Sequence, residues 1–278
     1  MDRLRLCGQH SSWRRPRVCR RPAGYPQDVP PSPKRSAGRP GADSALPAVA
    51  DPVAANARTR RALDALHARP VNYDPSAHER LESQAGWKRE TRCQPLPREP
   101  PGPPIAGGSW EIARELMRDY EFADPSMVRA VYQPDAPLEG RDMLLVVRFL
   151  FLRLRVGVRV GGVLDETRSV DGRTVRLWGW NYRTLRGHFE MGQMDYEVWK
   201  WQDTGEVEFR VRGYWRPGGS RNPLIRLGFR LFGPRQRERF YAAAARRIVE
   251  LTTARLEGLR ADARPRVVDE IAAAPKAR

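Results

Sequence analysis

The sequence predicts an α+β fold in which one curved antiparallel sheet wraps around a long C-terminal helix. Two observations carry this prediction. Residues 141–215 alternate apolar and polar side chains, which is the period of half-buried strands. Residues 235–259 instead repeat apolar side chains at helical spacing. Because helices and strands are segregated along the chain, they are expected to form two layers around one core.

The chain divides into a domain and two tails. Residues 1–52 are rich in Arg, Pro, Gly and Ser and lack apolar periodicity, so this segment is predicted to be disordered. Residues 57–259 are predicted to form a single domain, and 278 residues suit one large domain plus tails. Residues 260–278 are expected to be a flexible C-terminal tail.

Several elements are predicted before the main sheet. Residues 56–68 have the pattern of a short helix, and residues 69–73 that of a first strand. Ser109 is placed to cap a helix that ends near Tyr120. Asp124-Pro125 is typical of the start of a further helix.

Within and after the sheet, glycines and prolines predict turns and breaks. Asp171-Gly172 between alternating segments is a strong hairpin signal, and a second hairpin is expected around residues 203–205. Gly157, Gly161 and Gly162 indicate a bulge or a bend in the sheet. Gly233-Pro234 is predicted to end one helix before the long final helix begins.

The chain is strongly basic, with a formal net charge of +17. Only four of its 50 basic residues are lysines, a bias that a GC-rich genome explains better than a phosphate-reading surface. The arginine row at positions 148, 153, 155 and 159 is interpreted as a solvated strand face. We therefore expect no specific nucleic-acid partner, although an arginine-driven nucleic-acid or membrane-surface binder stays an alternative.

One segment, residues 179–192, resembles the signature of an uncharacterised family of bacterial and plant proteins. Its shared residues are an aromatic, Thr-Leu, Gly-His, Glu, Gly and a later aromatic, here Tyr182, Thr184, Leu185, Gly187, His188, Glu190, Gly192 and Tyr196. Arg216-Pro217, residues 233–236 and, more loosely, residues 73–75 match further family elements. The sequence departs from the family at Gln193-Met194, where many members carry Glu-Glu.

The resembled family is similar in plan to START and polyketide-cyclase-like helix-grip proteins. Those proteins hold small apolar molecules between a curved sheet and a long C-terminal helix. The resemblance therefore implies a binding module for a small apolar ligand, and fold alone does not name that ligand.

Three aromatic residues are candidates for the ligand-binding wall. Trp178, Trp180 and Tyr182 lie at strand spacing and share one face. Aromatic side chains line many ligand pockets, and they also fill ordinary sheet cores. Both interpretations remain open for this face, with His188 as a further wall candidate.

His188 and Glu190 are the candidates for chemistry. Two residues apart in an extended segment, they point to the same side, and a carboxylate beside an imidazole suits a general base. An enzyme with this pair as acid and base and Tyr182 as helper is the second hypothesis. The alternative role for His188 and Glu190 is to brace the turn by hydrogen bonds. No metal site or cofactor is predicted, because the histidines lack metal-ligand spacing.

The expected location is the cytoplasm. Three cysteines are too few for a disulfide framework, and the first twenty residues lack the apolar core of a signal peptide. The most apolar stretch contains four arginines, so no transmembrane segment is predicted.

Overall fold

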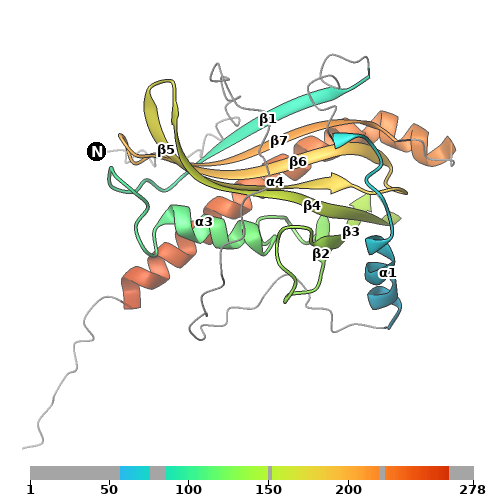
Figure 1. Ribbon diagram of the computed structural model, residues 1–278, viewed down its shortest axis with the longest axis horizontal. Coiled ribbons are helices and arrows are strands. Elements are labelled where there is room, and N and C mark those ends of the chain that lie inside the picture. Colours follow the sequence, from blue (N-terminus) through green and yellow to red (C-terminus); the bar gives the residue numbers. More distant parts are fainter. Residues whose placement is uncertain (1–56, 76–85, 150–151, 219–222, 263–278) are drawn as a thin grey trace, which may run out of the picture.

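Seven antiparallel strands form one curved sheet in the computed structural model, with the spatial order β1-β7-β6-β5-β4-β3-β2 (Figure 1). The structure describes residues 57–75, 86–149, 152–218 and 223–262. The strands are β1 Lys88–Leu96, β2 Val128–Val131, β3 Asp142–Phe149, β4 Leu152–Val170, β5 Arg173–Thr184, β6 Glu190–Trp201 and β7 Val207–Pro217. The helices are α1 Ala57–His67, α3 Ser109–Arg118 and α4 Pro223–Asp262.

The predicted fold class is confirmed. Helices α3 and α4 lie on the same side of the sheet, and α4 runs along the inner face (Figure 1). Tyr241, Ala244 and Ile248 of α4 are buried in the same core cluster as the inward side chains of the strands. Sheet and helix thus bury their apolar faces against each other, which is the helix-grip arrangement.

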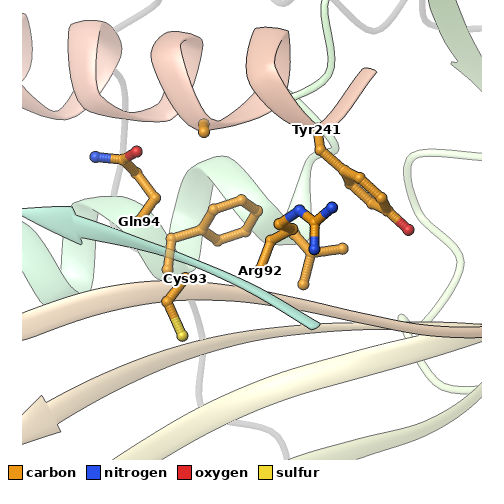
Figure 2. Close-up of a pocket in the computed structure, with 7 residues that line it drawn as sticks. Arg92, Cys93, Gln94 and Tyr241 are labelled. Carbon is orange, nitrogen blue, oxygen red and sulfur yellow. The ribbon is translucent and has the colours of Figure 1, made fainter. Parts of the chain in front are cut away.

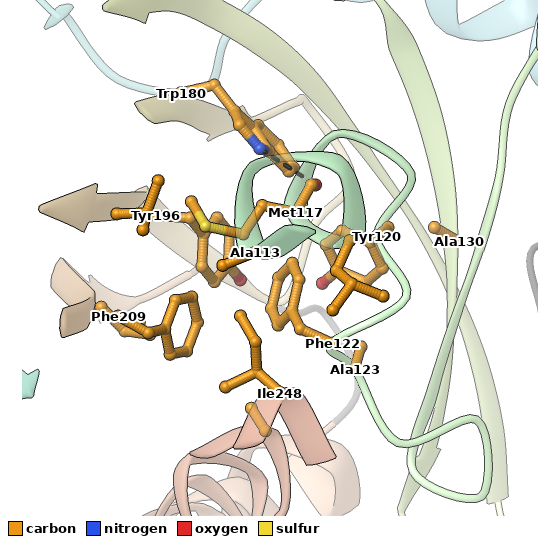
Figure 3. Close-up of a cluster of buried hydrophobic side chains, with 14 of the residues drawn as sticks. Ala113, Met117, Tyr120, Phe122, Ala123, Ala130, Trp180, Tyr196, Phe209 and Ile248 are labelled. Atoms are coloured by element: carbon orange, nitrogen blue, oxygen red, sulfur yellow. Dashed lines mark hydrogen bonds between the residues drawn. The ribbon is translucent and has the colours of Figure 1, made fainter. Parts of the chain in front are cut away.

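The main core lies between this inner face, α3 and α4 (Figure 3). Trp180 and Tyr196 reach into it from neighbouring strands, and Phe122 packs on Tyr196 with ring centroids 4.6 Å apart. Alternation along β5 and β6 turns every second side chain inward, which is why these aromatics meet. The predicted shared face of Trp178, Trp180 and Tyr182 belongs to this cluster.

Helix α1 packs on the other face of the sheet. Leu63 and Leu66 form a small cluster with Leu144 and Leu185. Gly157 makes room for this helix, because a Cβ there would lie 2.5 Å from Leu66 Cδ2. The sheet irregularity instead falls between Val160 and Gly162 on β4, where the register with β5 shifts. A bulge or bend was predicted at Gly157, Gly161 and Gly162, and the structure places the irregularity at Gly161 and Gly162, inside the continuous strand β4.

Both predicted hairpins are present. Asp171 and Gly172 adopt φ values of 51° and 76°, and they join β4 to β5. Positive φ at both central residues is the type I′ pattern that matches strand twist. Gly205, with φ of 71°, closes the turn between β6 and β7.

The elements before the sheet differ from prediction in three places. Residues 69–73 form only an isolated bridge, between Val71 and Leu185, rather than a strand. The segment after Asp124-Pro125 is strand β2 and no helix: Asp124 caps a turn by accepting the Ser126 amide at 2.8 Å, and residues 128–131 then pair with β3. Strand β1 was not predicted, since its nine residues are mostly polar and include Pro95.

Helix α3 is present but is capped differently. Ser109 is its first residue, and its hydroxyl donates to the Pro97 carbonyl at 2.6 Å. The Glu99 carboxylate, brought in from the loop, accepts the Trp110 amide at 2.8 Å. Glu99 also pairs with Lys200 at 2.5 Å, and both side chains are at most 2% exposed. A buried ion pair therefore fixes the start of α3 to β6.

Helix α4 is continuous through Gly233-Pro234, so the predicted break there is wrong. The helix extends to Asp262, and the predicted disordered tail at 1–52 lies outside the described residues, as does the rest of the C-terminal tail. Among the helices of the described segments, none is long and apolar enough to cross a membrane.

Candidate functional site

A pocket of about 130 Å³ opens between the inner face of the sheet and α4. It is lined by the loop after α3, by β2, β3, β5 and β6, and by α4. We call it the sheet–helix pocket. Its apolar lining comes from Met127, Val128, Leu145, Val147, Phe189, Met194 and Phe240. An apolar wall with a few polar groups is usual for small-molecule sites.

The polar groups of the pocket come from three parts of the chain. They are Tyr120, Tyr182, His188, Glu190, Gln236, Arg237 and Tyr241. Of the residues predicted from sequence, Tyr182, His188 and Glu190 are brought together here. The pocket wall does not include Trp178 or Trp180, which are 6% and 3% exposed within the core.

Glu190 is held by Arg237 of α4. The two form an ion pair, and the Arg237 guanidinium stacks on Trp215 with its carbon 3.6 Å from the ring centroid. Burial raises the pKa of the Glu190 carboxyl, although Arg237 acts to lower it. The pair ties the start of β6 to α4 at the edge of the pocket.

His188 braces the turn that leads into β6. Its Nδ1 accepts the Glu190 amide at 2.9 Å and also lies 3.1 Å from the Glu190 carbonyl oxygen. We assign the ring proton to Nε2 because the amide contact is the shorter of the two. Burial lowers the pKa of His188 to about 4, so the ring is neutral near neutral pH.

The carboxylate of Glu190 thus pairs with Arg237, while the imidazole contacts the Glu190 backbone. This geometry differs from a general base, in which a carboxylate orients the imidazole. It matches the bracing role that the sequence left open. The assignment of His188 and Glu190 as acid and base stays a prediction.

Two further signature residues, Thr184 and Gly192, form a hydrogen-bonded corner around this turn together with Asn72. The Thr184 hydroxyl accepts the Gly192 amide at 2.9 Å and donates to the Asn72 side chain at 2.7 Å. Asn72 in turn donates to the Glu190 carbonyl at 2.9 Å. Gly192 is required here, because a Cβ would lie 2.1 Å from the Tyr214 carbonyl oxygen. The signature therefore fixes the backbone that presents His188 and Glu190.

Tyr120 enters the pocket from a strained backbone position. The Tyr120 and Glu121 amides bond back to the Met117 and Leu116 carbonyls at 3.2 and 2.8 Å, which is a Schellman end to α3. Tyr120 has φ of 61° at the position that glycine usually occupies, at a cost of about 1 kcal/mol. Sequence reasoning missed it, because no local signal marks a tyrosine at this position.

Arg237, Gln236 and Met194 were also missed as pocket residues. Gln236 belongs to the family-like segment 233–236, which lies inside α4, but its contact partner could not be read from spacing. Met194 occupies one of the two positions where Glu is frequent in resembling sequences, so this chain places a thioether in the wall. Gln193 points elsewhere and accepts hydrogen bonds from Arg183 and Tyr214 at 3.0 and 3.2 Å.

A second opening, of about 10 Å³, lies where β1 and β7 meet α4 (Figure 2). Its walls include Arg92, Gln94 and Tyr241, which Figure 2 shows between the strand and the helix. This is about the space of one water molecule. It is too small for an organic ligand, so the sheet–helix pocket is the candidate site.

Three arginines of the row, Arg148, Arg153 and Arg155, are exposed, and Arg148 lies opposite Arg153 on the neighbouring strand. Arg159 bonds Asp142 at 2.7 Å and the Leu66 and His67 carbonyls at 2.9 and 3.0 Å, so it closes the end of α1. In the described segments there is no group of three or more His, Cys, Asp or Glu side chains placed to hold a metal ion.

A family model described as a domain of unknown function, DUF1990, matches residues 73–247. The chain belongs to the DUF1990 family. This confirms the resemblance found in the signature segment, and the matched range contains every pocket residue named above. No curated protein matches the sequence of this DUF1990 chain.

Two solved structures are similar to the DUF1990 chain at low identity. One is a point mutant of norcoclaurine synthase from Thalictrum flavum in complex with a transition state analogue. It shares 11% sequence identity with this chain at a TM-score of 0.40, and the match covers 62% of this chain and 98% of the synthase chain. The other is Ara h 8.0201, with 6% identity and a TM-score of 0.34, covering 61% and 99%.

Proposed function

We propose that this DUF1990 domain binds a small, largely apolar molecule in the sheet–helix pocket. The observation that carries the proposal is the pocket itself, about 130 Å³ of space between sheet and α4 with an apolar lining and a few polar groups. A buried apolar cavity of about 150 Å³ is enough to hold benzene. The expected ligand is therefore a single ring or a short acyl chain, or a larger molecule that inserts such a part.

The same site supports binding better than catalysis. The Glu190 carboxylate is engaged by Arg237, and the His188 imidazole is engaged by the turn that it braces. These contacts account for Glu190 and His188 as structural residues of the pocket wall. Cytoplasmic location and the absence of a specific nucleic-acid partner stay predictions that accompany this proposal.

Native mass spectrometry of the protein purified from its own host tests the proposal. We expect a small molecule to travel with the wild-type domain and to be lost from Val147→Phe, which fills the pocket from β3. Val146→Phe is the matched control, because the neighbouring residue on a strand points to the opposite face. A folded wild-type protein that carries no molecule, and that small aromatic compounds do not stabilise against heat, would contradict the proposal.

A further inference from the structure

The wall of the sheet–helix pocket includes a tyrosine, Tyr120, whose buried hydroxyl makes no hydrogen bond within the described residues. Tyr120 lines the sheet–helix pocket and is 5% exposed, yet its hydroxyl has no hydrogen-bond partner within the described part of the chain. Leaving a buried polar group unpaired is costly, and most such groups in proteins are satisfied. The position of Tyr120 therefore needs an explanation beyond packing.

Two further tyrosines surround this hydroxyl. The Tyr120 ring lies 6.1 Å from the ring of Tyr196, and Tyr196 lies 5.8 Å from Tyr182. Figure 3 shows Tyr120 coming from the loop after α3 and Tyr196 from the sheet. The three phenols lie close enough to shift one another's pKa, but within the described residues neither the Tyr120 nor the Tyr196 hydroxyl makes a contact with the geometry of a hydrogen bond. Burial raises the pKa of each, so all three stay protonated.

The backbone of Tyr120 supports the same conclusion. A residue with φ of 61° that is not glycine persists only where the surrounding structure holds it. The strained turn carries the Tyr120 ring to the pocket. Glycine at this position would relieve the strain, but it would supply no hydroxyl. Strain and an unpaired donor at the same residue are typical of a site that is completed by a ligand.

The charges around the pocket select against an anion. Arg237 is already paired with Glu190, and the Glu190 carboxylate lies close enough to Tyr182 to raise its pKa. An anion placed among the phenols would lose its hydration without gaining an unpaired cation. A neutral oxygen would instead bond a tyrosine hydroxyl and keep its apolar remainder against the wall.

We infer that the ligand of the sheet–helix pocket is an apolar molecule carrying one uncharged oxygen, a hydroxyl or a carbonyl, which pairs with the hydroxyl of Tyr120. This inference rests on the proposed function and names the chemistry of the same site. Phenol and toluene are suitable probes, because they have nearly the same shape and differ in the oxygen.

Calorimetric titration of both probes into wild type and Tyr120→Phe tests the inference. The ratio of phenol affinity to toluene affinity should fall about tenfold in the variant, roughly the worth of one hydrogen bond. Toluene binding should be retained. Tyr132→Phe is the matched control: Tyr132 is also buried, but its hydroxyl already donates to the Asp119 carbonyl at 3.1 Å outside the pocket. Its affinity ratio should stay at the wild-type value.

The outcomes separate the two claims. If neither probe binds wild type, the proposed function fails and the inference fails with it. If both bind with the same affinity ratio in wild type and Tyr120→Phe, the pocket stands and the inference is overturned, as it would be by a resident water that satisfies Tyr120. Tighter binding of benzoate than of phenol would overturn the requirement for an uncharged oxygen.

Discussion

The indole nitrogen of Trp180 donates to the backbone carbonyl oxygen of Met117 at 3.1 Å, and the same oxygen accepts the Tyr120 amide at 3.2 Å. Figure 3 shows this contact between the sheet and the end of α3. One side chain of β5 thus holds the turn that places Tyr120 in the pocket. Trp180, predicted as either core or pocket wall, contributes to the site through this contact while lying in the core.

Trp180→Ala should destabilise the protein by about 3–5 kcal/mol, because it opens a cavity in a filled core and removes one of the two hydrogen bonds to the Met117 carbonyl. Urea unfolding followed by circular dichroism measures the loss. Trp180→Phe should cost less, since it keeps most of the packing. A loss below about 1 kcal/mol for the alanine variant would show that one face of the indole already lacks neighbours.

The buried pair of Glu99 and Lys200 gives a second stability test. Lys200→Met leaves the Glu99 carboxylate buried without its ammonium partner, which should cost about 3–5 kcal/mol. Glu99→Gln combined with Lys200→Met removes both charges and keeps an acceptor for the Trp110 amide, so it should recover a large part of that loss. Chemical unfolding of the single and double variants measures both changes. A double variant less stable than Lys200→Met alone would contradict the account.

His188 predicts a defined dependence of stability on pH. Its pKa is lowered in the fold from 6.5 to about 4, so the unfolded state takes up a proton first as the pH falls. Stability from this residue is present above about pH 6.5 and is lost between about pH 6.5 and 4, by about 1–3 kcal/mol.

The difference between wild type and His188→Asn, measured by urea unfolding at several pH values, isolates this contribution. Asparagine keeps an acceptor for the Glu190 amide and does not titrate. His67→Asn is the control, because the His67 side chain is 91% exposed. Parallel pH profiles for wild type and His188→Asn would show that His188 is not held neutral.

Gly192 and Gly140 test the crowding at the signature corner. Both have positive φ, 152° and 75°, but a Cβ at Gly192 would meet the Tyr214 carbonyl oxygen, whereas nothing lies within 4 Å at Gly140. Gly140→Ala should cost about 1 kcal/mol from backbone strain. Gly192→Ala should cost about 1–3 kcal/mol more, because the sheet must move. Thermal unfolding of both variants compares them, and equal losses would refute the close approach.

The sequence was sufficient for the fold because its strongest signals are local. The alternation in β5, β6 and β7 is a property of neighbouring residues, and so is the Asp171-Gly172 turn. Both are found in the structure as predicted. Strand β1 could not be predicted from the sequence pattern, because an edge strand needs no apolar alternation. Strand β2 was mistaken for a helix because Asp-Pro starts both helices and turns.

The candidate site was only partly predictable, for a related reason. Tyr182, His188 and Glu190 lie within one motif, and their shared placement follows from strand geometry. Tyr120 lies 62 positions before Tyr182 in the sequence, and Arg237 lies 55 positions after it. Only tertiary packing brings these two residues to the pocket. Trp178 and Trp180 share the predicted face but lie farther along the sheet, where α3 fills the space that a ligand would need.

Methionine methyl NMR during a titration with toluene tests the central claim most directly, because it reports binding and its location together. Met127 and Met194 line the sheet–helix pocket, whereas Met191 contacts Arg216 away from it. We expect saturable shifts of the Met127 and Met194 methyl signals, loss of those shifts in Val147→Phe, and an unchanged Met191 signal. Saturation with no shift at Met127 or Met194, or no saturable shift at all, would contradict a ligand site between the sheet and α4.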